Sequence, residues 1–242
     1  MGEEMDTKDI KIKILGIAGT PIKNGNCQYQ LEEALKLAET LGQATTELVH
    51  LSDYEINFCI GCEKCLRKVH KIQAEVGFNI SPVPVEGYNC SIKDGMKELH
   101  LKMLDADAII LMAPVYIASI PGQVKTFIDR CRTFVHDFRL QDKVATAMTI
   151  GFFRNAGQDT ALSLMRTSLS ALGLNVVSYG SAAVSTKEGL GIPIRETRFA
   201  VKEDFAGAIM MDLAVKKLVR TAIHIKAGKL ALEEMRLASD SN

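Results

Sequence analysis

Three cysteines stand three residues apart in INFCIGCEKCLRK (56–68), at Cys59, Cys62 and Cys65, in a chain that has six cysteines in all. The spacing C-x2-C-x2-C lets one tightly curled loop present three thiolates to an iron-sulfur cluster, while a fourth cysteine arrives from elsewhere. A zinc site completed by His70 or His100 is a second interpretation, because zinc also accepts three thiolates and an imidazole. Metal-free redox thiols are a third, although a C-x-x-C pair leaves one cysteine unexplained.

Polar and aromatic residues follow three apolar runs that have the pattern of strands. GTPIKNGNC (19–27) follows the first run, and its Gly, Thr and Asn groups suit a single phosphate at a helix start. APVYIASIPGQVK (113–125) and GFFRNAGQDT (151–160) follow the other two runs and offer aromatic rings and backbone polar groups to a flat heterocycle. Because the carboxyl ends of parallel strands share one edge, we expect all three loops to line one crevice.

Each loop also has a simpler interpretation. The first reads equally well as a Gly/Asn turn before a helix capped by Asn26. Tyr116 and Phe152 can be aromatic residues at the edge of the core, and Arg154 a solvated cation. The first loop has neither G-x-G-x-x-G nor G-x-x-x-x-G-K-[ST], which argues against ATP and against a tightly held dinucleotide there.

Strand-like runs alternate with helical periodicities along the chain, which is typical of a parallel sheet covered on both faces. The predicted strands are 10–19, 45–51, 107–113, 143–151 and 174–180, and the predicted helices start at Asn26, near 92, at Pro121 and after Gly157. This pattern predicts a single doubly wound α/β domain over residues 1–242. Residues 56–91 form a cysteine-containing loop in this scheme, with a polar insertion at about 66–89 that fits no element.

The tail at 203–238 has the periodicity of a helical extension. Its apolar stripe comprises Met211, Val215, Leu218, Ala222 and Ile225. We expect this stripe to pack on the core rather than on a second subunit, because such stripes are usually internal.

Composition excludes several classes of function. Lys and Arg number 29 and Asp and Glu number 29, so no excess of charge favours a nucleic acid or an anionic membrane as partner. The charged start MGEEMDTKDIKIK is unlike a signal peptide, and no apolar run approaches the ~18 residues of a membrane span. We therefore expect a cytoplasmic protein with a small-molecule ligand, in which clustered cysteines serve a metal or redox chemistry.

Five stretches together resemble the iron-sulfur flavoprotein branch of the NADPH-dependent FMN reductase family. They are GTPIKNGN, the cysteine run, CSIKDGM, ADAIILMAPVYIASIPGQVKTFIDR and AGQDTAL, in consistent order over about residues 10–180. The resemblance implies a flavodoxin-like fold with FMN at the switch point of a five-stranded sheet of order 2-1-3-4-5. The cysteine loop would follow the second strand, and an extra helix would follow the sheet.

The resemblance also implies which residues bind FMN. The phosphate loop would use Thr20, Lys23, Asn24, Asn26 and Cys27; the flavin edge Pro114, Val115, Tyr116 and Ile117; and the third loop Gly151, Phe152, Phe153, Arg154, Asn155 and Gly157. The family usually has Ser or Thr where Cys27 stands and often Arg where Ile22 stands, so one hydroxyl contact to the phosphate is missing here.

Cys90 is the fourth ligand that the resemblance implies for a [4Fe-4S] cluster with Cys59, Cys62 and Cys65, because CSIKDGM resembles the segment that holds the last cluster cysteine. The 24 residues between Cys65 and Cys90 must loop out and return. Closure of such a loop costs little extra, since its entropy grows only logarithmically with length. If Cys90 does not return, a three-iron cluster or an empty site follows. Cys131 is interpreted as buried packing.

Three functions follow from these residues. The leading hypothesis is an electron-transfer flavoprotein, a homodimer or homotetramer, that holds FMN and one cluster and takes electrons from reduced ferredoxin or NAD(P)H. No side-chain catalyst is required for it. The second is an NAD(P)H-dependent FMN or quinone reductase without a functional cluster. The third is a non-catalytic flavin or thiol redox sensor.

Overall fold

The structure is a computed structural model that describes residues 10–77, 82–187 and 199–240. Within these residues, one parallel sheet contains β1 (Ile12–Ala18), β2 (Ala44–His50), β3 (Ala108–Pro114), β4 (Val144–Gly151), β5 (Asn175–Val176) and β6 (Ser181–Val184). Its order is β2-β1-β3-β4-β5, with β6 also paired to β4. The predicted flavodoxin-like order 2-1-3-4-5 is confirmed.

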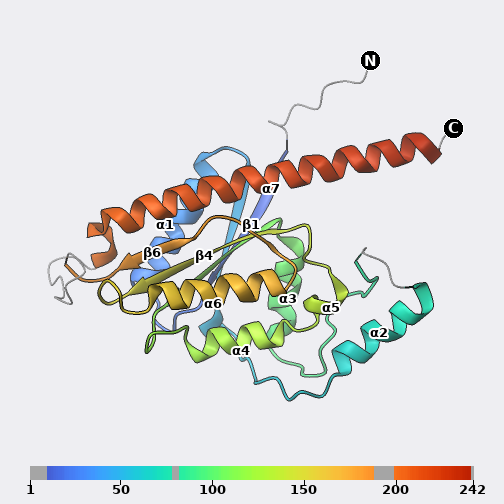
Figure 1. Ribbon diagram of the computed structural model, residues 1–242, viewed down its shortest axis with the longest axis horizontal. Helices are drawn as coiled ribbons and strands as arrows, with labels where there is room; N and C mark the ends of the chain where they lie inside the picture. Colours follow the sequence, from blue (N-terminus) through green and yellow to red (C-terminus); the bar gives the residue numbers. More distant parts are fainter. Residues whose placement is uncertain (1–9, 78–81, 188–198, 241–242) are drawn as a thin grey trace.

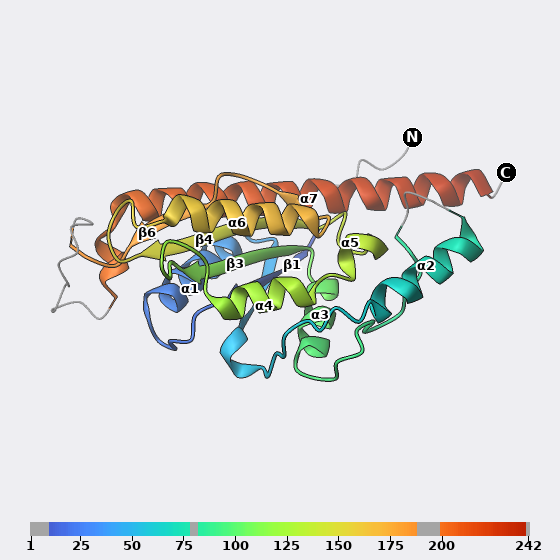
Figure 2. The same cartoon turned by 60° about the horizontal axis from the view of Figure 1, so that its bottom comes forward.

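Helices cover both faces of the sheet, as Figures 1 and 2 show. On one face α3 (Met96–Asp105), α4 (Gly122–Arg130) and α6 (Gln158–Ala171) pack with Leu15 and Ile17 of β1. On the other face α1 (Asn26–Thr40) and α7 (Phe205–Asp240) pack with Ile12 and Ile14. Neighbouring residues of a strand point to opposite faces of the sheet, and here both faces are covered by helices. Nearly every residue of β1 is therefore buried, and its sequence is an almost continuous apolar run.

The predicted fifth strand at 174–180 is wrong as one continuous element. Two short strands, β5 and β6, pair in turn with β4, from Val144 to Gly151. Ser178 and Gly180, which lie between them, have φ of +62° and +100°. An extended strand cannot continue through residues with left-handed backbone angles, so the strand is interrupted there. Pairing then resumes further along the same side of β4.

The predicted cap of α1 by Asn26 is also wrong. Gly25 precedes the helix in an extended conformation and no side chain caps it. The Asn26 Oδ1 instead accepts a hydrogen bond of 3.0 Å from the Val201 N–H, in the short 3₁₀ helix η3 (Ala200–Glu203). The Asn26 side chain, which local preference would place at the helix cap, thus binds a residue far away in the sequence. The local sequence gives no sign of this contact.

The predicted insertion is not a loop throughout, because α2 (Lys64–Val76) occupies its first half. Leu66 and Val69 are buried, and Val69 packs with Val83 and Val85 in a small cluster separate from the sheet. In Figure 2, α2 lies away from the sheet, on the side of α5 (Phe134–Asp137). The residues Leu66, Val69, Ile72 and Val76 have helical spacing, which is the signal that would have predicted α2.

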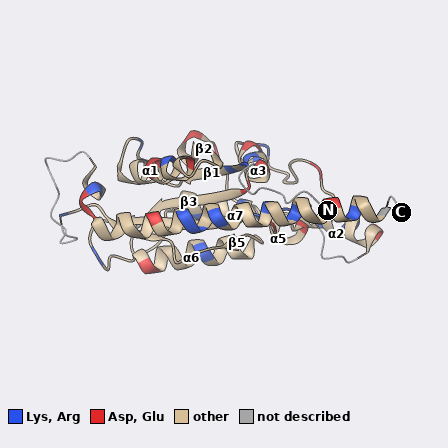
Figure 3. Ribbon diagram, turned by 90° about the horizontal axis from the view of Figure 1, so that it is seen from above, with Lys and Arg blue, Asp and Glu red and all other residues tan. Residues whose placement is uncertain are grey.

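The C-terminal helix α7 crosses the whole molecule and projects beyond the sheet at its far end (Figure 1). Val215, Leu218 and Ala222 are buried against the sheet, so the predicted packing of this stripe on the core is confirmed. Lys and Arg positions recur along α7 (Figure 3), and Lys217 and Arg220 are exposed. No helix of the described residues is long and apolar enough to cross a membrane.

A buried histidine should make the fold sensitive to acid. His100 of α3 is fully buried, and burial lowers its pKa from 6.5 to about 3. Below pH 6.5 the unfolded chain gains a proton that the folded chain excludes, so stability present above this pH is lost as the pH falls toward the folded pKa. At about pH 4.5 this costs roughly 3 kcal/mol, on the basis of about 1.4 kcal/mol per pH unit.

The measurement is the free energy of unfolding in urea, at neutral pH and at about pH 4.5, for wild type and His100→Gln. Glutamine keeps a donor for the Arg130 carbonyl, which lies 3.1 Å from the His100 Nε2, but does not titrate. The loss between the two pH values should shrink in this variant. His224→Gln, on an exposed side of α7, is the matched control and should keep the full loss. An equal loss in both variants would contradict the prediction.

Candidate functional site

The loops after β1, β3 and β4 meet at the carboxyl edge of the sheet; residues 19–25, 115–121 and 152–157 are called the edge loops below. The Gly19 N–H donates to the Met112 carbonyl at 2.7 Å, and the Gln123 side chain donates to the Gly19 carbonyl at 2.9 Å. The Val115 N–H donates to the Ile150 carbonyl at 2.9 Å. These hydrogen bonds join the ends of neighbouring strands, so the three predicted ligand loops begin side by side along one edge.

The loop after β3 forms a strained hairpin. Tyr116 and Ser119 exchange two backbone hydrogen bonds, of 2.8 and 3.0 Å, around Ile117 and Ala118. Both central residues have positive φ, +46° and +54°, in a turn that normally takes Asn-Gly. Each such residue costs about 1–3 kcal/mol, and strain of this kind gathers at functional sites. Ile117 at the tip is 98% exposed, which is a large cost in apolar surface as well.

The loop after β4 packs directly on this hairpin. Gly157 has φ of +103°, and a Cβ on it would lie only 2.4 Å from the Ala118 Cα. Glycine is therefore required both by its backbone angle and by the close approach of the two loops. Phe152 and Phe153, which follow β4, are about half exposed. Together with Tyr116 they leave aromatic surface at the edge where a flat ligand is expected.

The N-terminus of α1 is open to an anion. No side chain caps it and no acidic residue lies in its first turn. The first backbone N–H groups of a helix lack partners within the helix, and the helix dipole favours negative charge there. Thr20, in the loop before it, is buried, and its Oγ1 accepts a hydrogen bond of 3.1 Å from the Ile22 N–H. The loop geometry suits a phosphate held mainly by backbone groups.

Four side chains predicted to bind FMN are engaged elsewhere. Lys23 forms an ion pair with Asp53 of η2 (Leu51–Asp53), and Asn26 binds Val201. Arg154 forms an ion pair with the buried Asp204, which also accepts the Val184 and Gly207 N–H groups. Cys27 is buried in the core, and burial raises the pKa of its thiol to about 12. A phosphate contact from any of these side chains would require it to exchange partners.

The insertion does return to the cysteine triple. The Cys62 Sγ lies 3.1 Å from the Ser91 Oγ, and the Asn89 side chain donates to the Cys65 carbonyl at 3.0 Å. Asn89 and Ser91 are the two chain neighbours of Cys90, so both sides of Cys90 touch the triple. The hydrogen bond from Ser91 lowers the pKa of the Cys62 thiol. Burial raises that of Cys65, and the nearby Cys90 adds to the rise.

The sulfur atoms do not converge into a metal-binding group. Across residues 10–77, 82–187 and 199–240, no three Cys, His, Asp or Glu side chains are placed to hold one ion. Cys59 is exposed, whereas Cys62 and Cys65 are only partly exposed. The two candidate histidines lie against other residues: the ring of His100 is buried beside the Arg130 carbonyl, and His70 meets His136 edge to face at 5.8 Å.

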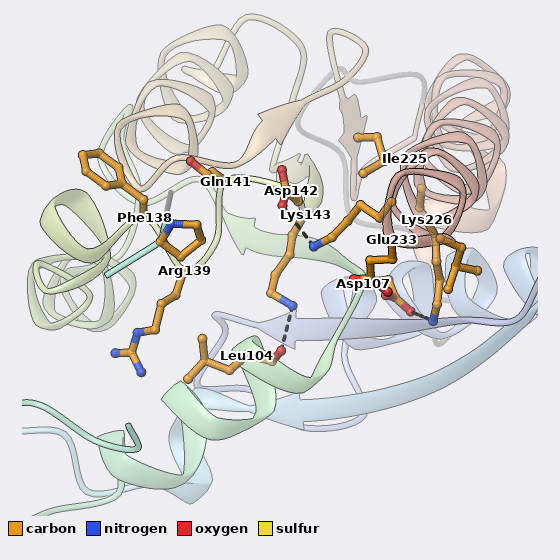
Figure 4. A pocket seen from close by; sticks show the side chains of 14 residues that line it. Leu104, Asp107, Phe138, Arg139, Gln141, Asp142, Lys143, Ile225, Lys226 and Glu233 are labelled. Carbon is orange, nitrogen blue, oxygen red and sulfur yellow. Dashed lines mark hydrogen bonds and ion pairs between the residues drawn. The ribbon is translucent and has the colours of Figure 1, made fainter. Parts of the chain in front are cut away.

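A hollow of about 460 Å³ lies at the opposite, amino edge of the sheet, between α7 and the starts of β3 and β4 (Figure 4). Four of its charged side chains form two ion pairs: Lys226 with Asp107 at 2.9 Å, and Lys229 with Asp142 at 3.0 Å. Lys143, whose pKa is lowered by burial, donates to the carbonyls of Leu104 and Ala106. These pairs attach α7 to the sheet, so the hollow is explained by helix packing.

Comparison with known proteins places the chain in a family. Residues 12–189 match the NADPH-dependent FMN reductase family. The chain belongs to this family. An iron-sulfur flavoprotein of Methanocaldococcus jannaschii is 33% identical over 185 residues, which are 74% of this chain and 86% of the relative. Another, from Archaeoglobus fulgidus, is 32% identical over 207 residues, 84% of this chain and 94% of the relative.

As a member of the NADPH-dependent FMN reductase family, the chain is a flavin-dependent oxidoreductase, and the resemblance to the iron-sulfur flavoprotein branch is confirmed. Among solved structures, RosB with a bound flavin-phosphate intermediate superposes with a TM-score of 0.65 at 15% identity, covering 96% of this chain and 88% of RosB. The apo NADH:FMN oxidoreductase EmoB gives 0.57 at 18% identity, covering 87% and 90%. At these identities the superpositions establish the fold alone.

Burial predicts the order in which the six thiols react. In the metal-free, reduced protein, Cys59 and Cys62 should be alkylated first, because they are at least partly exposed. Cys27 and Cys131 should react only when the chain unfolds, since both are buried and burial raises their pKa. Peptide mass spectrometry after timed exposure to iodoacetamide measures the order. Modification of Cys27 as fast as Cys59 in the folded protein would contradict it.

Proposed function

We propose that the chain is an electron-transfer oxidoreductase that uses FMN at the edge loops and a [4Fe-4S] cluster at Cys59, Cys62, Cys65 and Cys90. The observation that carries the proposal is the return of the insertion, with Asn89 against Cys65 and Ser91 against Cys62. Four thiols at the ends of one closed segment are the donor set that an iron-sulfur cluster takes. The curated relatives named iron-sulfur flavoproteins support the same pairing of cofactors.

The edge loops fit FMN in three respects. The open N-terminus of α1 suits its single phosphate, with Thr20 and Asn24 in the loop before it. Pro114, Val115, Tyr116 and Ile117 supply a strained hairpin beside the ring. Gly151, Phe152, Phe153, Asn155 and Gly157 form the third contact, and the Arg154 side chain joins them only if it leaves its ion pair with Asp204. Because Lys23, Asn26 and Cys27 are engaged elsewhere, we assign the phosphate chiefly to backbone groups.

The protein positions the cofactors, which supply the redox chemistry when bound: flavin exchanges two electrons with NAD(P)H, or single electrons with the cluster or a reduced ferredoxin. The edge loops would hold the flavin ring, with the half-exposed Tyr116 as one of the side chains available to contact it. The cysteine loop is the part that must rearrange, because Cys59 is exposed while Cys62 and Cys65 lie beside the returning chain. A homodimer or homotetramer is proposed from the family alone.

A second candidate is an FMN reductase that works without a cluster. It is favoured by the finding that, among the described residues, no three potential ligands converge. An FMN-dependent NADH:quinone oxidoreductase of Sinorhizobium fredii, 27% identical over 141 residues, shows that related chains exist under that name. In this case hydride would pass from nicotinamide to flavin, and the cysteines would not affect turnover.

The close approach of two edge loops gives a test of the flavin site. Gly157→Ala should lower FMN affinity by roughly tenfold, since the new Cβ meets the Ala118 backbone and positive φ is strained for alanine. Quenching of flavin fluorescence on titration into the apoprotein measures this affinity. Gly122→Ala is the control at the same edge, because its Cβ would have no atom within 4 Å. Equal affinities in the two variants would contradict the assignment.

Iron content separates the two candidates. Anaerobically purified or reconstituted protein should hold about four iron and four sulfide per chain, in addition to flavin. Cys65→Ser or Cys90→Ser should remove most of this iron, while Cys131→Ser, which changes a buried thiol at the C-terminal end of α4, should keep it. Protein that binds FMN but takes up no iron under any of these conditions would favour the cluster-free reductase.

A further inference from the structure

A buried ion pair contacts both ends of the cysteine segment. Arg130, at the end of α4, and Asp94, just before α3, have side chains that are 1% and 2% exposed. The guanidinium meets the carboxylate with both of its terminal nitrogens, Nη1 to Oδ2 at 2.7 Å and Nη2 to Oδ1 at 3.0 Å. This is the parallel two-bond geometry that gives an Arg–carboxylate pair a fixed orientation.

The same guanidinium also reaches both ends of the cysteine segment. Its Nη1 donates to the Asn57 carbonyl at 2.6 Å, two residues before Cys59. Its Nη2 donates to the Tyr88 hydroxyl at 2.7 Å and lies 3.7 Å from the Cys90 Sγ. Asp94 in turn accepts the Asn57 N–H at 3.0 Å. Residues 57 and 88–94 are therefore held together through one side-chain pair.

Lysine could not replace arginine in this role. The four N–H groups of Nη1 and Nη2 point to Asp94 twice, to Asn57 and to Tyr88, in one plane. An ammonium group offers three donors from a single atom and cannot span these partners. Burial also argues against a purely stabilising purpose, since a buried ion pair usually contributes little to stability but does fix one arrangement of the groups around it.

We infer that Arg130 is a positioning residue that, with Asp94, closes the cysteine segment and holds Cys90 beside Cys62 and Cys65. The inference rests on the proposed function, because it concerns the order of the thiol ligands. The Arg130–Asp94 pair is called the clamp below. Without the clamp, we expect α2 to remain but the return of Cys90 to the triple to be no longer fixed.

The test replaces the clamp by an apolar pair, Arg130→Met with Asp94→Leu, so that no unpaired charge stays buried. The control makes the same changes in an exposed ion pair of α4, Lys125→Met with Asp129→Leu. Hydrogen exchange, followed by mass spectrometry on the metal-free proteins, should be at least tenfold faster at residues 56–63 and 86–93 in the clamp variant. Exchange in the sheet strands should not change, and the control should match wild type throughout.

A second measurement joins the clamp to the thiol site. Co²⁺ is titrated into the reduced apoprotein, and the sulfur-to-cobalt absorption band reports thiolate ligation. Loss of the clamp should weaken Co²⁺ binding at least tenfold. In wild type, Cys90→Ser should weaken Co²⁺ binding to a similar extent. In the clamp variant, the same substitution should weaken Co²⁺ binding less than twofold further, because Cys90 is already misplaced there. A merely structural role of the clamp would not remove the effect of Cys90→Ser.

The outcomes separate the inference from the proposed function. Unchanged exchange at 56–63 and 86–93 overturns the clamp, whatever the metal data show. Faster exchange together with an undiminished effect of Cys90→Ser in the clamp variant overturns the positioning of Cys90. If Cys90→Ser has no effect on Co²⁺ binding in wild type, the four-cysteine site of the proposed function fails, while faster exchange would still establish the clamp as the closure of the segment.

Discussion

Parallel strand pairing is the constraint on which the rest of the structure depends. β1 pairs in parallel with β2 and β3, and β3 with β4, so four strands end at the same edge. After each strand the chain must return to the opposite edge of the sheet, and it does so through a helix that covers one face. The loops between the strands and these helices are left exposed. The three edge loops, which hold the candidate flavin-binding residues, therefore lie at the same edge. The strain at Ile117 and Ala118 is tolerated because the buried strands on either side hold the turn.

The cysteine site is built by a different physical principle. It follows β2, which is the edge strand of the sheet, and its return segment is not itself part of a strand. Side-chain ion pairs take over this role. Arg130 and Asp94 hold Tyr88, while Arg139, paired with the buried Asp137, donates to the Val85 and Gly87 carbonyls at 3.0 and 2.9 Å. Burial alone would raise the pKa of Asp94, but its bonds to Arg130 and to backbone N–H groups hold it at about 2, so the carboxylate stays charged.

The fold was largely predictable because its signals are local. Buried parallel strands such as 107–113 are continuous apolar runs, and the residues after them are recognisable by type. The failures involve contacts far apart in sequence or weak signals. The Asn26 side chain binds Val201 instead of capping α1, and the fifth strand is broken at Ser178 and Gly180. The helix α2 lies in a polar segment and buries only Leu66 and Val69. The role of Arg130 has no local signal, since nothing in its neighbourhood in the sequence indicates Asp94 as its partner.

The candidate site was predictable in its loops and less so in its side chains. Family patterns place Lys23, Arg154 and Asn26 near a flavin, yet each is paired with a residue from another part of the chain. An arginine or lysine beside an acidic partner has two minima, one paired within the protein and one paired with a phosphate, and the second is reached only when the ligand repays the lost ion pair. Backbone N–H groups have no such alternative, because the geometry of the strand and helix fixes them before any ligand arrives. In this fold the phosphate affinity should therefore depend more on the start of α1 than on any one charged side chain.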